Sequence, residues 1–203
     1  MMPGGQEAAM EEARLKTIAH RRRIRHWTHE KALGDDWIGK LETTPEIPGI
    51  AQINGVYLMS WYKDRPVVVR PPDATVAEIP YLDVDEQTAA SQGQRTSEEA
   101  LERWLTAAAK DRHGIRINGW YQHGCLTLAP SPTNQDVPPE TRRYDLFLCA
   151  TTSALDDLPE DAWARRTITR KDFVELIRTR HPEYVELIEQ AHDGFLIRRA
   201  QEV

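Results

Sequence analysis

Short apolar runs rich in β-branched and aromatic residues, separated by residues typical of tight turns, constrain the fold of this chain more than any other feature. Asn54-Gly55 and Asn118-Gly119 each stand between two such runs. Asn-Gly between apolar flanks favours a two-residue hairpin, because a type I′ turn needs positive φ at both central residues. A further turn is expected at residues 62–65 in the first copy and at His123-Gly124 in the second. The sequence therefore predicts two three-stranded meanders.

The two copies share the residues Ile-Asn-Gly at the same place in the pattern. An internal duplication would produce this likeness, and so would two hairpins that acquired the same turn dipeptide independently. Both interpretations stay open at this point.

Helical patterns occur before, between and after the predicted meanders. Residues 6–33 are rich in Ala, Glu, Arg and Lys and predict a basic helix with a narrow apolar stripe. An apolar stripe over residues 97–113 predicts a middle helix, and residues 169–194 predict a helix pair that Pro182 divides. Runs of strands joined by tight turns favour antiparallel pairing, so we predict an α+β fold with a mainly antiparallel sheet of about six strands.

The prolines at positions 45 and 48 indicate a linker between two parts of the chain. We therefore predict an N-terminal basic helical arm over residues 1–45 and an α+β domain over residues 46–203. The narrow apolar stripe of the arm would bury little surface on its own, so we expect a partner to stabilise it.

Charge is distributed unevenly along the chain, although the net charge is only −6. Residues 14–26 hold six basic residues and no acidic one, whereas residues 71–99 hold seven acidic residues against Arg95. Such a separation of charge is typical of a chain that binds charged partners.

The basic segment suggests an interaction with nucleic acid. Arginine offers planar, bidentate donors that suit phosphate, and Trp27 offers a ring on which a base can stack. The predicted nucleic-acid-binding residues are Arg14, Lys16, Arg21, Arg22, Arg23, Arg25 and Trp27. The competing explanations are a solvated helix face with no partner and a helix that packs against the acidic stretch of its own chain or of a second copy.

The acidic stretch supports an alternative function. Asp83, Asp85 and Glu86 would contact a basic protein partner by mimicking the charge of phosphate. In that case the chain is a protein-binding inhibitor or adaptor, and it would act within a complex or as a homo-oligomer.

A hydrolase or metal-dependent nuclease is the third hypothesis. Asp145 is a carboxylate inside the most apolar strand-like run, and Cys125 follows His123-Gly124. A catalytic thiol needs an imidazole in contact and an oxyanion hole, and a buried structural thiol explains Cys125 equally well. The sequence contains no phosphate-binding loop, nucleophile elbow or set of metal ligands at a recognisable spacing. We therefore expect no metal, no cofactor and no catalysis.

The remaining composition limits where the protein acts. The two cysteines are too few for a disulfide scaffold, and no apolar run has the roughly 20 residues that a membrane-spanning helix needs. The first residues lack the basic and apolar regions of a secretory signal. We thus expect a cytoplasmic, bacterial-type regulatory protein that binds nucleic acid and has no membrane partner.

Overall fold

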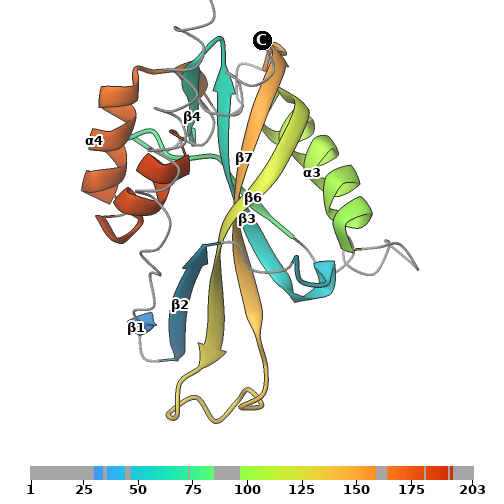
Figure 1. Ribbon diagram of the computed structural model, residues 1–203, viewed down its shortest axis with the longest axis vertical. Helices are drawn as coiled ribbons and strands as arrows, with labels where there is room; N and C mark the ends of the chain where they lie inside the picture. The colour runs from blue at the N-terminus through green and yellow to red at the C-terminus, as the bar shows by residue number, and fades with distance from the viewer. Residues whose placement is uncertain are drawn as a thin grey trace, which may run out of the picture.

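The computed structural model describes residues 30–33, 36–43, 47–72, 74–84, 97–158, 164–180, 182–191 and 193. These residues form an eight-stranded sheet (Figure 1), with seven strands in the order β1-β2-β6-β7-β3-β4-β8 and with β5 paired to β3. Its centre is formed by β6 (Ile115–Pro130), β7 (Arg143–Leu155) and β3 (Ile53–Tyr62). The other strands are β1 (Glu30–Leu33), β2 (Trp37–Thr43), β4 (Arg65–Arg70), β5 (Tyr81–Asp83) and β8 (Ala164–Thr167).

The sheet is mixed, because β3 and β7 pair in parallel while the other pairings in the described ranges are antiparallel. Two strands so far apart in sequence come to lie side by side through the crossover that contains the middle helix, as parallel pairing requires. The predicted α+β class is confirmed. The finer expectation of two local meanders did not foresee this central parallel pair.

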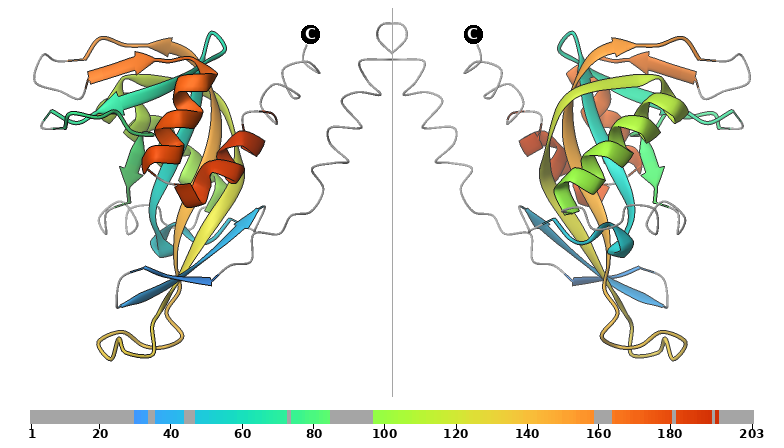
Figure 2. Two further views of the ribbon diagram at one scale, coloured as in Figure 1. Left: turned by 90° about the vertical axis from the view of Figure 1, so that its left-hand side faces the viewer. Right: turned by 90° about the vertical axis from the view of Figure 1, so that its right-hand side faces the viewer.

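Helices cover both faces of the sheet (Figure 1 and Figure 2). α3 (Ser97–His113) lies on one face, and α4 (Arg170–Arg180), η2 (Pro182–Tyr184) and the helical residues 185–191 lie on the other. A short 3₁₀ turn, η1 (Ile50–Gln52), precedes β3. Gly114 follows the last residue of α3 and has a φ of +60°, which glycine adopts at low cost. Its N–H donates to the Lys110 carbonyl at 2.8 Å and so caps the end of the helix.

Alternation along β7 divides the interior into two cores. Leu146 and Leu148 point to the face covered by α3, whereas Phe147 and Cys149 point to the face covered by α4 and residues 182–191. All four are buried. A strand buried on both faces reads as a continuous apolar run, which is why this segment is the most hydrophobic of the chain.

The Asn-Gly dipeptides are not hairpin turns, and this prediction was wrong. Asn54-Gly55 lies inside β3, and Asn118-Gly119 lies inside the single 16-residue strand β6. The pairing register shifts at both places, so each dipeptide belongs to a β-bulge. A further register shift spans Gln122 to Gly124, where the sequence predicts the His-Gly turn. Glycine suits a bulge as well as a turn, and local sequence cannot separate the two.

A tight hairpin lies at Lys63-Asp64, within the turn expected over residues 62–65. Lys63 has φ of 48° and Asp64 has φ of 65°, the positive values that a type I′ turn requires. The turn places Tyr62 beside Arg65 and starts β4 antiparallel to β3.

The last four residues of the predicted basic helix over residues 6–33 form a strand and not a helix. Residues 30–33 form β1, which pairs with β2, and β2 pairs in turn with β6. The rest of that predicted helix lies outside the described residues. β1 and β2 thus belong to the main sheet, although both precede the predicted domain boundary at residues 45 and 46. The boundary itself stays a prediction.

The middle helix and the C-terminal helix pair agree with the sequence analysis, in α3 and in α4 followed by residues 185–191. Within the described residues, no helix combines the length and the apolar character needed to cross a membrane.

Candidate active site

One carboxylate, Asp145, interrupts the apolar side chains of β7 near the start of that strand. It points to the same face as Phe147, and it is only partly exposed. The register places Asp145 beside Gly55 of β3, and Gly55 beside Asp83 of β5. Paired residues of neighbouring strands point to the same face, so the two aspartates flank Gly55 on one side of the sheet.

Gly55 leaves the space in which Tyr81 reaches Asp145. A Cβ at Gly55 would collide with the Tyr81 ring and hydroxyl and with the Leu82 carbonyl. The Tyr81 ring therefore covers the glycine, and its hydroxyl donates to Asp145 Oδ1 at 3.1 Å. Tyr81 is supported in turn by the Tyr57 ring, with 4.7 Å between the two ring centres.

The β-bulge of β3 adds a second hydrogen bond to Asp145. A bulge re-aims the side chains around it, and here the Asn54 amide hydrogen-bonds to the Asp145 carboxylate. The Asn54 carbonyl oxygen Oδ1 accepts from Arg143 Nη1 at 3.3 Å, which leaves the amide nitrogen to donate to Asp145. The carboxylate is thus held from two sides, by a phenol and by an amide.

The other carboxylate of this face, Asp83, is exposed and paired with a cation. Arg112, near the end of α3, donates from Nη1 to Asp83 Oδ2 at 3.3 Å. We call the group made of Asn54, Tyr81, Asp83, Arg112, Arg143 and Asp145 the Asp145 site. It combines two carboxylates, two guanidinium groups, a phenol and an amide, contributed by β3, β5, β7 and α3.

Burial sets the proton affinity of the central carboxylate. The pKa of Asp145 rises to about 6, mainly because burial penalises the ionised form, and the hydrogen bonds from Tyr81 and Asn54 oppose that rise. Burial beside this carboxylate also raises the pKa of Tyr81, so the phenol stays protonated and donates. A carboxylate with a pKa near neutrality can accept a proton in one step of a reaction and release it in the next.

Asp145 was a residue of interest in the sequence, and the structure gives it partners that the sequence did not reveal. The sequence does not single out Tyr81 as a site residue, and it predicts Asn54 only as a turn residue. The alternation of Tyr81, Leu82 and Asp83 in β5 was a usable signal, because period-two spacing puts the tyrosine and the aspartate on one face.

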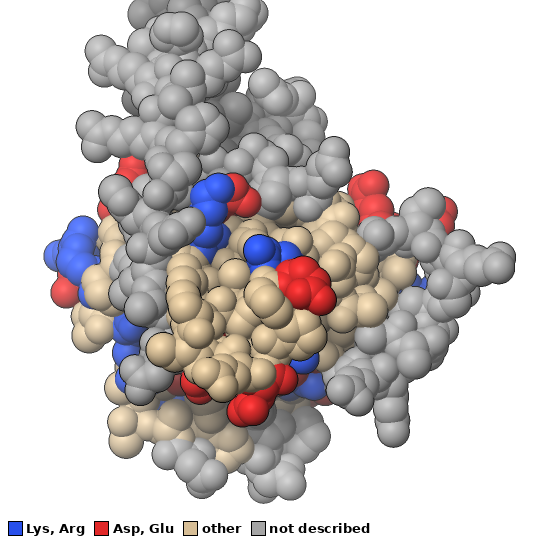
Figure 3. Space-filling model, turned by 90° about the horizontal axis from the view of Figure 1, so that it is seen from below, with Lys and Arg blue, Asp and Glu red and all other residues tan. Residues whose placement is uncertain are grey.

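The remaining predicted site residues fall into two groups. Asp83 lies in the Asp145 site, where it pairs with Arg112. Asp85, Glu86 and the predicted nucleic-acid-binding residues, Arg14, Lys16, Arg21, Arg22, Arg23, Arg25 and Trp27, lie outside the described residues. Seen from below, the face around the β6–β7 loop carries scattered charges of both signs rather than a patch of one sign (Figure 3).

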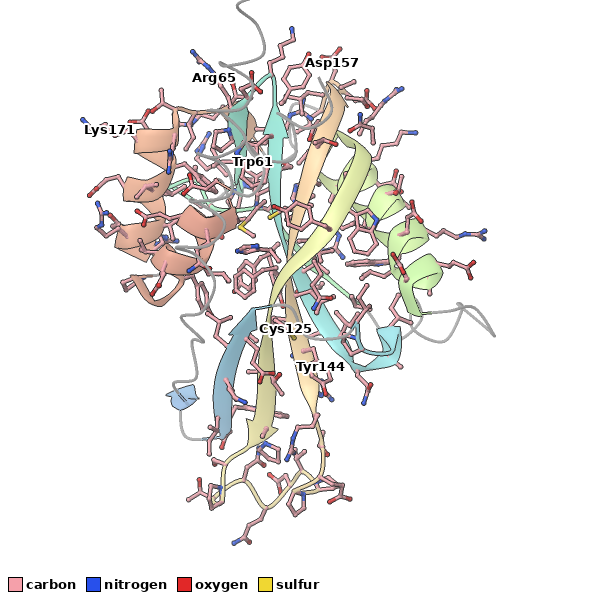
Figure 4. All side chains as sticks on the ribbon, in the orientation of Figure 1. Trp61, Arg65, Cys125, Tyr144, Asp157 and Lys171 are labelled. Carbon is pink, nitrogen blue, oxygen red and sulfur yellow. The ribbon has the colours of Figure 1, made fainter. Side chains whose placement is uncertain are left out.

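Cys125 does not form a Cys–His pair with His123. Cys125 is buried in the core on the α3 side of the sheet, and burial raises the pKa of its thiol to about 12. His123 Nε2 instead lies 2.9 Å from the Leu187 carbonyl oxygen, on the α4 side. The bulge between Gln122 and Gly124 separates the two side chains onto opposite faces. Figure 4 shows Cys125 on β6 and Tyr144 on β7, in the lower half of the sheet.

Within the ranges that the structure describes, no group of three or more His, Cys, Asp or Glu side chains is arranged to hold a metal ion.

No family model and no curated protein sequence matches this chain significantly. Among solved structures, it is similar to the crystal structure of a mutant of the Bacillus subtilis pyrophosphohydrolase BsRppH. The TM-score is 0.50 at 12% sequence identity, over 80% of this chain and 97% of that chain. At this identity the similarity establishes a shared fold.

This similarity corrects the function expected from the sequence. We expected a non-catalytic regulatory protein that binds nucleic acid, with a protein-binding inhibitor as the alternative. The fold is instead one that a pyrophosphohydrolase uses. The expectation failed because charge patterning reports what a surface attracts, whereas catalysis depends on a site that forms only when distant strands meet.

Proposed function

We propose that this protein is a hydrolase that cleaves a phosphoanhydride bond in a small phosphorylated substrate at the Asp145 site. Two independent observations support the proposal. The fold resembles that of a pyrophosphohydrolase, and the same fold here holds a carboxylate with a pKa of about 6 between two hydrogen-bond donors. The carboxylate is the observation that carries the proposal, because a fold alone does not specify a reaction.

Asp145 acts as the general base in this reaction. Its ionised carboxylate accepts a proton from a water molecule as the water oxygen forms a bond to phosphorus. The bond between that phosphorus and the bridging oxygen breaks, and the electron pair leaves with the phosphate group. Asp145 then returns its proton to solvent or to the leaving phosphate, which restores the starting state.

The neighbours of Asp145 orient it and favour an anionic substrate. Tyr81 and Asn54 hold the two sides of the carboxylate and thereby set its direction. Arg112 and Arg143 are exposed and bring positive charge to the same cluster. Guanidinium groups bind phosphate oxygens through charge-assisted hydrogen bonds, and a bound phosphate would compete with Asp83 for Arg112.

The test is a turnover assay on nucleoside triphosphates, nucleoside diphosphates and inorganic pyrophosphate, with Mg²⁺ present as the usual partner of polyphosphates. We expect the wild-type chain to release phosphate or pyrophosphate from at least one of them. Asp145→Asn should lower kcat by about 100-fold or more, because a general base contributes on that scale. Asp136→Asn changes an exposed aspartate of the β6–β7 loop and should leave turnover unchanged.

Gly55→Ala provides a second variant that keeps Asp145 itself. The added Cβ pushes the Tyr81 hydroxyl away from the carboxylate, so turnover should fall while the catalytic group remains. Gly119→Ala is the matched control, because a Cβ there meets Thr151 Oγ1 only at 3.4 Å. Circular dichroism confirms that each variant is folded. A wild-type chain that binds these phosphates without turning any of them over, or an Asp145→Asn variant of full activity, contradicts the proposal.

A further inference from the structure

A cavity separate from the Asp145 site lies over the paired strands β4 and β8, beside residues 75–77. Its volume is about 360 Å³, within the range of small-ligand pockets. The residues that line it include Val68, Arg70, Thr75, Ala77, Arg165 and Arg166. The antiparallel pairing of the two strands sets Arg166 beside Val68 and Arg165 beside Val69. β4 lies toward the upper end of the sheet in Figure 1, whereas Tyr144, the neighbour of Asp145, lies in the lower half in Figure 4.

Three of the lining residues are arginines. The side chain of Arg165 is held in place by two hydrogen bonds. Arg165 donates from Nη1 to the His113 carbonyl at 2.5 Å and from Nη2 to the Asp156 carbonyl at 2.6 Å. These bonds join β8 to the end of α3 and to the residues after β7. The carboxylates of Asp156 and Asp157 also interact electrostatically with Arg165. Alternation along β8 turns its side chain to the face opposite that of Arg166, so Arg165 anchors the wall of the cavity and is not a cation for a ligand.

The other two arginines retain donors for a ligand. Arg70 uses Nη1 to reach the Ala74 carbonyl at 3.0 Å, and a guanidinium has four further N–H donors. Arg166 is exposed, and among the described residues no carboxylate lies within ion-pair distance of it. Glu78, which forms a β-bridge with Val69 of β4, pairs instead with Arg180 at 3.1 Å.

Thr75 adds a hydroxyl to this positively charged lining. A cavity that offers guanidinium groups and a hydroxyl, with a small apolar floor of valine and alanine, fits a small anion with several acceptor oxygens. A phosphate group has that chemistry, and its oxygens accept bidentate hydrogen bonds from arginine.

We propose that the cavity over β4 and β8 is a binding site for the phosphate group of a small molecule, with Arg166 and Arg70 as the ligand-contacting cations and Arg165 as the residue that anchors β8. The volume leaves room for more than the phosphate alone, so a small phosphomonoester fits the site. The inference rests on the cavity and its cations, and it holds whether or not the Asp145 site is catalytic.

The test is calorimetric titration of the full chain with inorganic phosphate, ribose 5-phosphate and ribose. We expect both phosphates to bind and ribose not to bind, with the phosphomonoester binding more tightly. Arg166→Gln should weaken phosphate binding about tenfold, the effect of losing one charge-assisted contact. Arg166→Lys should restore part of the affinity, since it keeps the charge and loses the bidentate geometry.

Arg103→Gln is the matched control, because Arg103 is an exposed arginine of α3 that does not line the cavity. It should bind phosphate like the wild-type chain. Arg166 is not part of the Asp145 site, so Arg166→Gln should show the same phosphoanhydride turnover as the wild-type chain, which separates a failure of this proposal from a failure of the proposed hydrolase. Equal phosphate affinity in Arg166→Gln and in the wild-type chain, or no binding at millimolar phosphate, overturns the inference.

Discussion

At the scale of single residues, Asp145 shows how one carboxylate adds a titratable group to an otherwise apolar strand. The three residues that follow it in β7, residues 146–148, are buried leucine and phenylalanine, and such apolar surroundings raise the cost of ionising the carboxylate. Gly55 and Tyr81 make the position tolerable, the first by leaving space and the second by donating to the carboxylate. A buried carboxylate with fixed donors is an informative feature of an apolar interior.

The raised pKa of Asp145 makes stability depend on pH in a defined direction. The folded-state pKa of about 6 lies above the ordinary value of 3.8, so folding favours the protonated acid. The stabilising contribution is fully present below about pH 4 and is lost as the pH rises through about 6.

We therefore expect the wild-type chain to lose up to about 3 kcal/mol of unfolding free energy relative to Asp145→Asn between pH 4 and pH 7.5. Urea denaturation at a series of pH values measures this difference. The Asp136→Asn variant should follow the wild-type chain throughout. A constant difference between wild type and Asp145→Asn over this range would exclude a raised pKa at Asp145.

At the scale of elements, two dipeptides show how far a local turn preference decides the structure. Lys63-Asp64 forms the tight turn although lysine does not favour positive φ, and Asn54-Gly55 lies in a strand although it favours that turn. The bulge at Asn54 re-aims its amide toward Asp145. Tertiary pairing has overridden the local preference at Asn54-Gly55, whereas the turn at Lys63-Asp64 forms where the sequence predicts one.

The strained turn can be relieved by substitution. Lys63→Asn combined with Asp64→Gly replaces two residues at φ of 48° and 65° with the pair that suits a type I′ turn. The free energy of unfolding should rise by about 1 kcal/mol. Thermal unfolding monitored by circular dichroism measures the gain. The control, Lys63→Ala with Asp64→Ala, keeps the positive φ without glycine or asparagine and should not be stabilised; an equal gain in the control would exclude relief of strain.

At the scale of the whole molecule, one sheet supports two cores. Phe173 of α4 is buried in one core and Leu105 of α3 in the other, and the central strands contribute side chains to both. Because β7 is shared, neither core can lose its packing without disturbing the strand that the other core uses.

Phe173→Ala and Leu105→Ala should each destabilise the protein by about 3 to 5 kcal/mol, the cost of a large cavity in a packed interior. Each variant should still unfold in one transition, with circular dichroism and tryptophan fluorescence giving the same midpoint. Val76→Ala, at an exposed hydrophobic residue, should change the midpoint little. Two separate transitions in either core variant would show that the faces unfold independently.

Much of the secondary structure was accessible from the sequence, because it depends on local periodicity. The stripe in α3, the continuous apolar run in β7 and the turn over residues 62–65 are all patterns within a single segment. Asp145 was conspicuous for the same reason, as a carboxylate in an apolar run. These features determined the α+β class and one residue of the candidate active site.

The tertiary structure alone decided the rest. The parallel pairing of β3 with β7 joins segments about 90 residues apart, and only this pairing and that of β5 bring Asp145, Gly55 and Tyr81 together. The cavity over β4 and β8 likewise forms only where two strands from distant parts of the chain pair. Local sequence sets which residues favour a strand, but the partner of each strand is selected by burial of the whole sheet. A site shared between strands is therefore settled only when the sheet has formed.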